Sequence, residues 1–139
     1  MSEEQAQQLL YQMQMMEGYL SELTQKESTI VSIIREASSA IQSLKIVDNK
    51  TDNETLVPVG LGTFVKTKVV PNEKLILNIG AGIAVEKDKD SAINFLELRL
   101  KEMQVALQET SNQKQQIAAN LEHGKQQMEQ LLAMSRNKK

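Results

Sequence analysis

The side chains best suited to acid–base or metal chemistry are scattered along this chain. His123 is the only histidine and there is no cysteine, so the clustered ligands of a zinc site are missing. The Asp and Glu residues are spread along helical segments and are not paired over a pocket, as general acid–base catalysis would need. We therefore expect no enzyme, no metal and no cofactor, and we interpret His123 as a solvated helix residue.

A glycine motif occurs twice, as Gly60-Leu61-Gly62 and Gly80-Ala81-Gly82. A phosphate-binding loop needs a helix N-terminus directly after its glycines. Here each motif is followed by β-branched and apolar residues typical of a strand. Because glycine readily adopts the positive φ of a tight turn, each motif predicts a β-hairpin turn and not a nucleotide site.

The two motifs lie in the block 54–87, which is rich in β-branched residues and contains both prolines. It predicts two consecutive hairpins joined by a turn at Pro71-Asn72-Glu73. Four short strands with apolar residues on both faces cannot bury them alone, and their edges would stay unpaired. We therefore expect other chains to complete the block, through an assembly interface of Val57, Val59, Leu61, Phe64, Val65, Leu75, Leu77, Ile79, Ile83 and Val85.

Both segments outside this block carry apolar residues at alternating steps of three and four, which is the heptad repeat of a coiled coil. The first helix is expected from Ser2 to Lys45, and the second begins at Asp88 or Asp90 as N-cap. The first stripe is Leu9, Met13, Met16, Leu20, Leu23, Glu27, Ile30, Ile34, Ala37, Ile41 and Leu44. The second is Ile93, Leu96, Leu100, Met103, Leu107, Thr110, Lys114, Ile117, Leu121, Gly124, Met128 and Leu131.

The two stripes match when the helices run antiparallel, with Leu44 opposite Ile93 at one end of the seam. Glu27 then faces Thr110, and Lys114 lies one layer away, so that Glu27 and Lys114 can pair diagonally. A lone Glu in an apolar seam would be costly, and coinciding polar interruptions indicate a layer that fixes the register. A register shifted by one heptad is the alternative.

Methionine and leucine side chains gather where the free ends of the two predicted helices meet. Not all of them can fit into one coiled-coil seam, and flexible, polarizable Met suits promiscuous binding. We predict an adaptable apolar surface at this coiled-coil tip, whereas the alternative is self-packing helix ends. The residues of this predicted binding tip are Leu9, Leu10, Met13, Met15, Met16, Met128, Leu131, Leu132 and Met134.

Composition narrows the function classes further. The formal net charge of −2, with acidic and basic residues mixed, gives no basic field for nucleic acid. No segment reads as a signal peptide or a membrane span, so no membrane partner and a cytoplasmic location are expected. The predicted fold class is α+β, divided into a coiled-coil helix (1–46), two β-hairpins (47–88) and a second coiled-coil helix (89–139).

In this order of elements the chain closely resembles the α subunits of the archaeal prefoldin family. The most specific likeness lies in Leu56-Val57-Pro58-Val59-Gly60 and in the stretch from Ile79 to Glu86, and the presence of two hairpins resembles the α type. The resemblance implies a hexamer of two α and four β subunits, whose hairpins form a β-barrel platform carrying six coiled coils. It also implies an ATP-independent holdase chaperone that captures unfolded proteins at the tips and delivers them to a group II chaperonin.

A second hypothesis comes from a different class of function. The chain would then be a structural, prefoldin-like protein that assembles with itself through its hairpins into rings or filaments.

Overall fold

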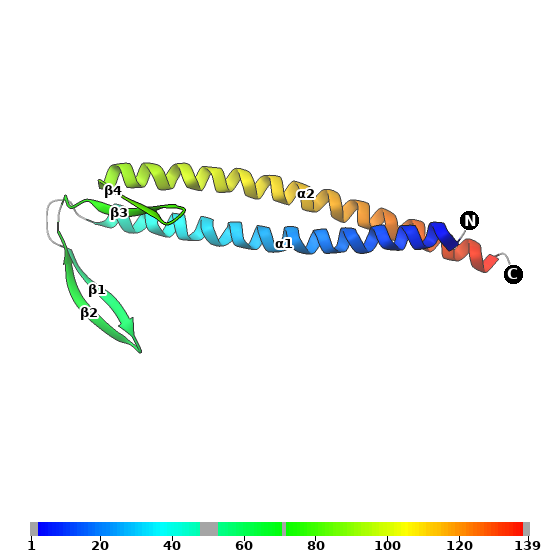
Figure 1. Cartoon of the computed structure of the whole chain (residues 1–139), viewed down its shortest axis with the longest axis horizontal. Helices are drawn as coiled ribbons and strands as arrows, with labels where there is room; N and C mark the ends of the chain where they lie inside the picture. Colours follow the sequence, from blue (N-terminus) through cyan, green and yellow to red (C-terminus); the bar gives the residue numbers. More distant parts are fainter. Residues whose placement is uncertain (1–2, 48–52, 71, 138–139) are drawn as a thin grey trace. The chain divides into compact units, whose positions relative to one another are not determined.

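The computed structural model describes residues 3–47, 53–70 and 72–137, which form two long helices and two β-hairpins. The predicted fold class is confirmed. Ser2 and Pro71, named above for the helix start and the connecting turn, lie outside the described residues. The elements are α1 (Glu3–Ile46), β1 (Asn53–Gly60), β2 (Thr63–Val69), β3 (Leu75–Gly80), β4 (Ile83–Lys87) and α2 (Lys89–Asn137) (Figure 1).

The heptad stripes are the shielded faces of both helices. Every stripe residue predicted from the sequence is buried or half-buried, whereas most residues between them are exposed. This is expected because steps of three and four place the stripe residues on one face of each helix, and a surface helix gains most of its stability from packing one apolar face. Among the described residues, the most deeply buried apolar side chains are Leu23, Ile30, Ala37, Ile41, Ala92 and Leu121.

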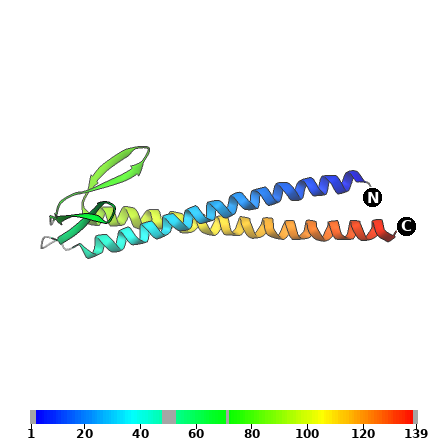
Figure 2. The same ribbon diagram turned by 90° about the horizontal axis from the view of Figure 1, so that it is seen from below.

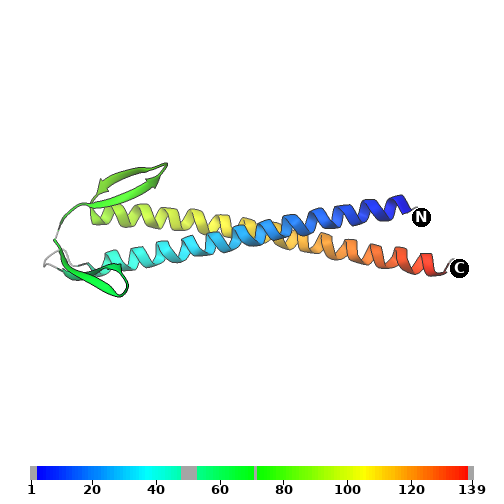
Figure 3. The ribbon, with the colours of Figure 1, turned by 60° about the horizontal axis from the view of Figure 1, so that its bottom comes forward.

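The chain forms two compact units, of which the first comprises Met1–Ile33 and Met103–Lys139. In this unit α1 and α2 run antiparallel, with the N-terminal end of α1 beside the C-terminal end of α2 (Figures 1 and 2). The blue and orange helical segments cross one another in Figure 3, as expected for helices that pack along a heptad seam. Leu23, Ile30 and Leu121 form the apolar centre of this unit.

The second unit, Ile34–Glu102, contains the other helix ends and both hairpins. Asp88 is the N-cap of α2, since its Oδ1 accepts a hydrogen bond of 2.7 Å from the backbone N–H of Ser91. This resolves the choice between Asp88 and Asp90. The next residue, Lys89, donates from Nζ to the carbonyl oxygen of Val47 at 2.6 Å, which satisfies an acceptor just beyond the end of α1.

Each hairpin is a separate two-stranded antiparallel sheet, β1 with β2 and β3 with β4. The two-residue turns Leu61-Gly62 and Ala81-Gly82 have positive φ at both positions, as the favoured hairpin turn requires. The pairing shifts by one residue just before each turn, so that Val59 and Ile79 sit in matching bulges. Glycines at 60 and 80, with φ of +124° and +106°, accommodate these bulges.

Candidate functional site

The two hairpins present the most exposed apolar surface of the second unit. Leu61 at the first turn is fully exposed, and Ile76 retains 77% of its accessible surface. Of the predicted assembly interface, Val57, Val59, Leu61, Phe64, Val65, Ile79 and Ile83 are exposed. The remaining three, Leu75, Leu77 and Val85, are half-buried.

The backbone of the hairpins is as open as their side chains. Each sheet has only two strands, and within the described residues neither hairpin pairs with the other. Each strand therefore has one edge that pairs with no other strand in the described chain. Val57 lies opposite Val65 and Leu77 opposite Val85, so apolar cross-strand pairs stand on surfaces that nothing in the described chain fully covers. Such two-stranded sheets are marginally stable without further cover.

At the free ends of the helices, the first unit carries a shallow groove of about 320 Å³. Leu9 of α1 and Leu131 and Met134 of α2 supply its apolar walls. Gln5, Gln127 and Gln130 also line it, and they were not foreseen from the sequence. Helical periodicity could have indicated Gln5, because it lies one turn before Leu9 on the same face of the helix. The groove thus combines apolar walls with amide groups that can donate and accept hydrogen bonds.

The predicted client-binding tip divides into two sets. Leu9, Met13, Met16, Met128 and Leu131 are half-buried seam residues. The exposed set is Leu10, Met15, Leu132 and Met134, which keep between 49% and 60% of their accessible surface. Only Leu9, Leu131 and Met134 of the nine line the groove. Self-packing therefore accounts for about half of the predicted tip, and the exposed set remains available for contacts outside this chain.

Gly124 explains how the helices approach one another near this groove. A Cβ atom built on Gly124 would lie 3.1 Å from Met13 Cγ and 3.9 Å from Leu9 Cδ1. Met13, which the predicted register places opposite Gly124, therefore occupies the space beside this glycine. A register shifted by one heptad would separate these two residues, so within this unit the predicted register is confirmed.

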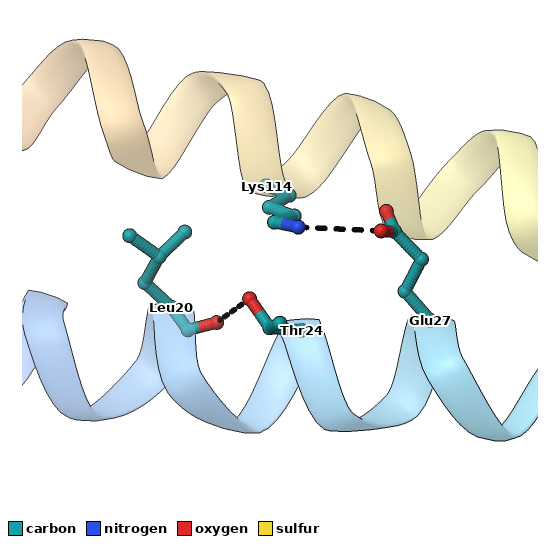
Figure 4. A network of polar contacts seen from close by, with 4 residues as sticks. All are labelled: Leu20, Thr24, Glu27 and Lys114. Atoms are coloured by element: carbon teal, nitrogen blue, oxygen red, sulfur yellow. Dashed lines mark hydrogen bonds and ion pairs between the residues drawn. The ribbon is translucent and has the colours of Figure 1, made fainter.

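The polar layer of the seam forms as the sequence predicts. Lys114 Nζ lies 3.2 Å from Glu27 Oε1, and each side chain is about 30% exposed (Figure 4). Thr110 is only 2% exposed, and its hydroxyl donates to the carbonyl oxygen of Ala106 at 2.8 Å. The layer therefore has its polar atoms paired, as a buried polar contact in a coiled coil requires.

The acid–base residues are not brought together. His123 is exposed, with its Nε2 3.3 Å from Gln127 Nε2. Among the residues that the structure describes, no group of His, Cys, Asp or Glu side chains is placed to hold a metal ion. Neither α1 nor α2, as described, contains a stretch apolar enough to cross a membrane. Two surfaces remain open for contacts, the hairpins in one unit and the coiled-coil tip in the other.

An antiparallel two-helix coiled coil that carries open β-hairpins defines a class of assembling coiled-coil subunits, and known proteins show the same combination. The family model described as "Prefoldin subunit" matches residues 3–134. The chain is 53% identical over 132 residues to prefoldin subunit alpha of Nitrosopumilus maritimus, which covers 95% of this chain and 91% of that relative.

Two solved structures share the fold. The crystal structure of the prefoldin beta subunit from Thermococcus strain KS-1 matches with a TM-score of 0.64 at 16% identity, covering 92% of each chain. The cryo-EM structure of filamentous PFD from Methanocaldococcus jannaschii matches with a TM-score of 0.50 at 21% identity, covering 86% of this chain and 95% of that one. The chain belongs to the prefoldin family, a family of chaperone subunits.

Proposed function

We propose that this chain is the α-type subunit of an ATP-independent holdase. In the proposed assembly, two copies join four β-type subunits, and the hairpins of all six combine into a β-barrel platform. The coiled-coil tips capture unfolded proteins and deliver them to a group II chaperonin. A cytoplasmic location, with no nucleic-acid or membrane partner, belongs to the same proposal.

The assembly part of the proposal is supported by the hairpins. Val57, Val59 and Phe64 are exposed on strands that each have one edge without a strand partner in the described chain. Burying apolar surface gives about 25 cal/mol per Å², and pairing strand edges satisfies their backbone groups. Neighbouring hairpins supply both kinds of contact at once. The relative from Nitrosopumilus maritimus, named prefoldin subunit alpha, supports the assignment to the α type.

The proposed capture of unfolded proteins rests on the apolar surface at the free helix ends, which consists of the groove and the exposed side chains. Leu9, Leu131 and Met134 line the groove, while Leu10 and Met15 are exposed beside it in sequence. An unfolded client exposes scattered apolar groups without fixed shape, and adaptable Met and Leu side chains can repack around them. Each contact is weak, but several tips acting on one chain multiply their affinities.

The self-assembling structural protein is the second candidate. The open strand edges favour it too, because a strand edge can pair with another copy as readily as with a β-type subunit. The chain also shares its fold with the filamentous PFD of Methanocaldococcus jannaschii, which is consistent with this candidate.

Light scattering and an aggregation assay separate the two candidates. The chain is measured alone and after mixing with a β-type subunit, and each sample is then tested for suppression of aggregation of chemically denatured citrate synthase. The holdase proposal predicts a defined heterohexamer that suppresses aggregation without ATP. Indefinite polymers of this chain without such suppression would support the structural candidate instead.

A further inference from the structure

The outer face of α1 carries an apolar stripe that the seam does not use. Tyr11, Met15 and Tyr19 follow one another at intervals of four residues, and they keep 64%, 60% and 45% of their accessible surface. Residues spaced in this way are neighbours on a helix surface. Tyr11 and Tyr19 are also the only tyrosines of the chain. The stripe therefore gathers aromatic surface where nothing in the described part of this unit covers it.

Gly18 lies within this stripe, next to Tyr19 and three residues after Met15. Glycine is unfavourable inside a helix, so its presence calls for a reason. For Gly124, the other helix glycine, the reason is Met13, which fills the space of its missing side chain. A Cβ built on Gly18 would meet nothing within 4 Å. Packing within the described chain therefore does not require glycine at position 18, whereas close approach of an outside group to the backbone would.

The charges of α1 beside the stripe are negative as far as Glu22, and Lys26 lies one turn beyond it. Residues 3–25 contain four Glu and no Lys or Arg, and the first cation is Lys26. Glu4 lies two turns before Tyr11, and Glu22 two turns after Met15, so both bracket the stripe on the same helix face. No salt bridge within the described residues engages any of the four carboxylates, including from Lys125 and Arg136 of α2. These four carboxylates can therefore form ion pairs with a bound partner.

We propose that the Tyr11–Met15–Tyr19 stripe extends the client-binding tip from Met15 along the outer face of α1, and that it selects unfolded segments that combine apolar side chains with Lys or Arg. This inference rests on the proposed holdase function and adds the class of client. Apolar groups of the client pack on the two rings and on the open backbone at Gly18. Its cations lie near Glu4 and Glu22, where exposed pairs add modest affinity and strong salt dependence. Cations can also lie over the faces of Tyr11 and Tyr19.

The two tyrosines of the stripe can report binding by their fluorescence. Since it contains no Trp, its tyrosine fluorescence comes only from Tyr11 and Tyr19. The probes are two disordered peptides of about 15 residues without Tyr or Trp, one alternating Lys with Leu and Phe, the other with Glu in place of each Lys. We expect the Lys peptide to bind the full-length chain about tenfold more tightly and to protect both tyrosines from acrylamide quenching.

Two variants test the parts of the surface separately. Glu4→Gln with Glu22→Gln should weaken binding of the Lys peptide about threefold to tenfold and leave the Glu peptide unaffected or slightly favoured. Gly18→Ala should keep or raise the Tm, because no neighbour is displaced and alanine favours the helix. It should nevertheless weaken both peptides by about threefold or more. Ser28→Ala, at an exposed site of the same helix outside the stripe, is the matched control and should leave binding unchanged.

Equal binding of the two peptides by the natural chain would overturn the charge preference. Unchanged quenching on binding, or wild-type binding by Gly18→Ala, would show that the stripe is not the contact surface. If the stripe variants changed the size of the assembly with β-type subunits and not peptide binding, the stripe would be a subunit contact and the inference would be wrong. If the wild-type hexamer suppressed aggregation and the variants matched it, this inference alone would fail, whereas inactive wild-type hexamers would overturn the proposed function itself.

Discussion

Glu27 and Lys114 show how two single residues set the pairing of long helices. A one-heptad shift would move each of them against an apolar layer and leave a half-shielded charge without its partner. The contact of Met13 with Gly124 works in the same direction, because a Cβ atom at position 124 would crowd Met13 Cγ at 3.1 Å. Polar pairing and a matched gap thus reinforce one register within this unit.

Replacing Glu27 and Lys114 together by Leu should raise the Tm, by a gain of about 1 kcal/mol in unfolding free energy. The gain is modest because both side chains are about 30% exposed. Glu27→Leu alone should lower the Tm, since it leaves Lys114 unpaired. Thermal melts of both single variants and the double variant complete the cycle.

The same double variant should loosen the register. Cysteines placed at positions 13 and 124 should form their disulfide almost completely in the natural seam and less completely after the change, because a shifted register separates the two positions. A lower Tm for the double variant would mean that the ion pair stabilises the coil more than an apolar layer does, contrary to this account.

At the scale of elements, Asp88 defines where α2 begins. The N–H of Ser91 hydrogen-bonds to the Asp88 carboxylate and holds the pKa of that group below its ordinary value. The charged form is thus favoured in the folded state. Its stabilising effect is fully present above the ordinary Asp pKa of about 4 and is lost as the pH falls through the lower folded pKa.

Asp88→Ala should therefore lower the Tm at pH 7 and reduce the loss of stability on acidification below about pH 4. Asp88→Asn is the matched variant, because Asn caps helices well but does not titrate in this range. It should keep most of the Tm at pH 7 and share the flatter acid profile. Thermal melts between pH 2.5 and 7 measure both effects. Parallel profiles for the natural chain and Asp88→Asn would show that this cap does not contribute to the pH dependence.

The elements divide into features that local sequence determines and features that it does not. Heptad spacing is a local pattern, so the stripes from Leu9 to Leu44 and from Ile93 to Leu131 could be predicted residue by residue. The glycine motifs gave the hairpin turns for the same reason. The bulges at Val59 and Ile79 could not be predicted, because they depend on the backbone angles that Gly60 and Gly80 adopt.

The candidate site was predictable only in part. Apolar type alone does not separate Leu9, which faces the seam, from Leu10, which is exposed, whereas their positions in the heptad do. The glutamines of the groove escaped prediction because polar residues on coiled-coil surfaces are common. The role of Gly124 depends on a contact across the seam, where Met13 of the other helix occupies the space beside it.

At the scale of the whole molecule, assembly through the hairpins is the first prediction. Val59 is exposed at a bulge, and Leu77 is paired with Val85 on a half-buried face. Val59→Asp with Leu77→Asp would place two carboxylates in the proposed subunit interface without partners, which costs several kcal/mol. Sedimentation should show dissociated subunits. Leu10→Asp, the same kind of change at the coiled-coil tip, is the control and should leave the hexamer intact; an intact hexamer for the hairpin variant would contradict the assembly model.

The most direct test of the account asks whether the exposed tip side chains hold the client. Leu10, Met15, Leu132 and Met134 are changed together to Ser, which leaves the half-buried seam residues in place. Each change removes an apolar contact worth up to roughly 1.5–3 kcal/mol when fully buried.

A second, truncated variant lacks residues 1–16 and 128–139. Light scattering first confirms hexamers of the expected size, and aggregation suppression of one denatured client is then compared at equal concentration. The account predicts a clear loss of suppression in both, partial because the β-type tips remain; suppression indistinguishable from that of the natural hexamer would show that the α tips do not hold the client.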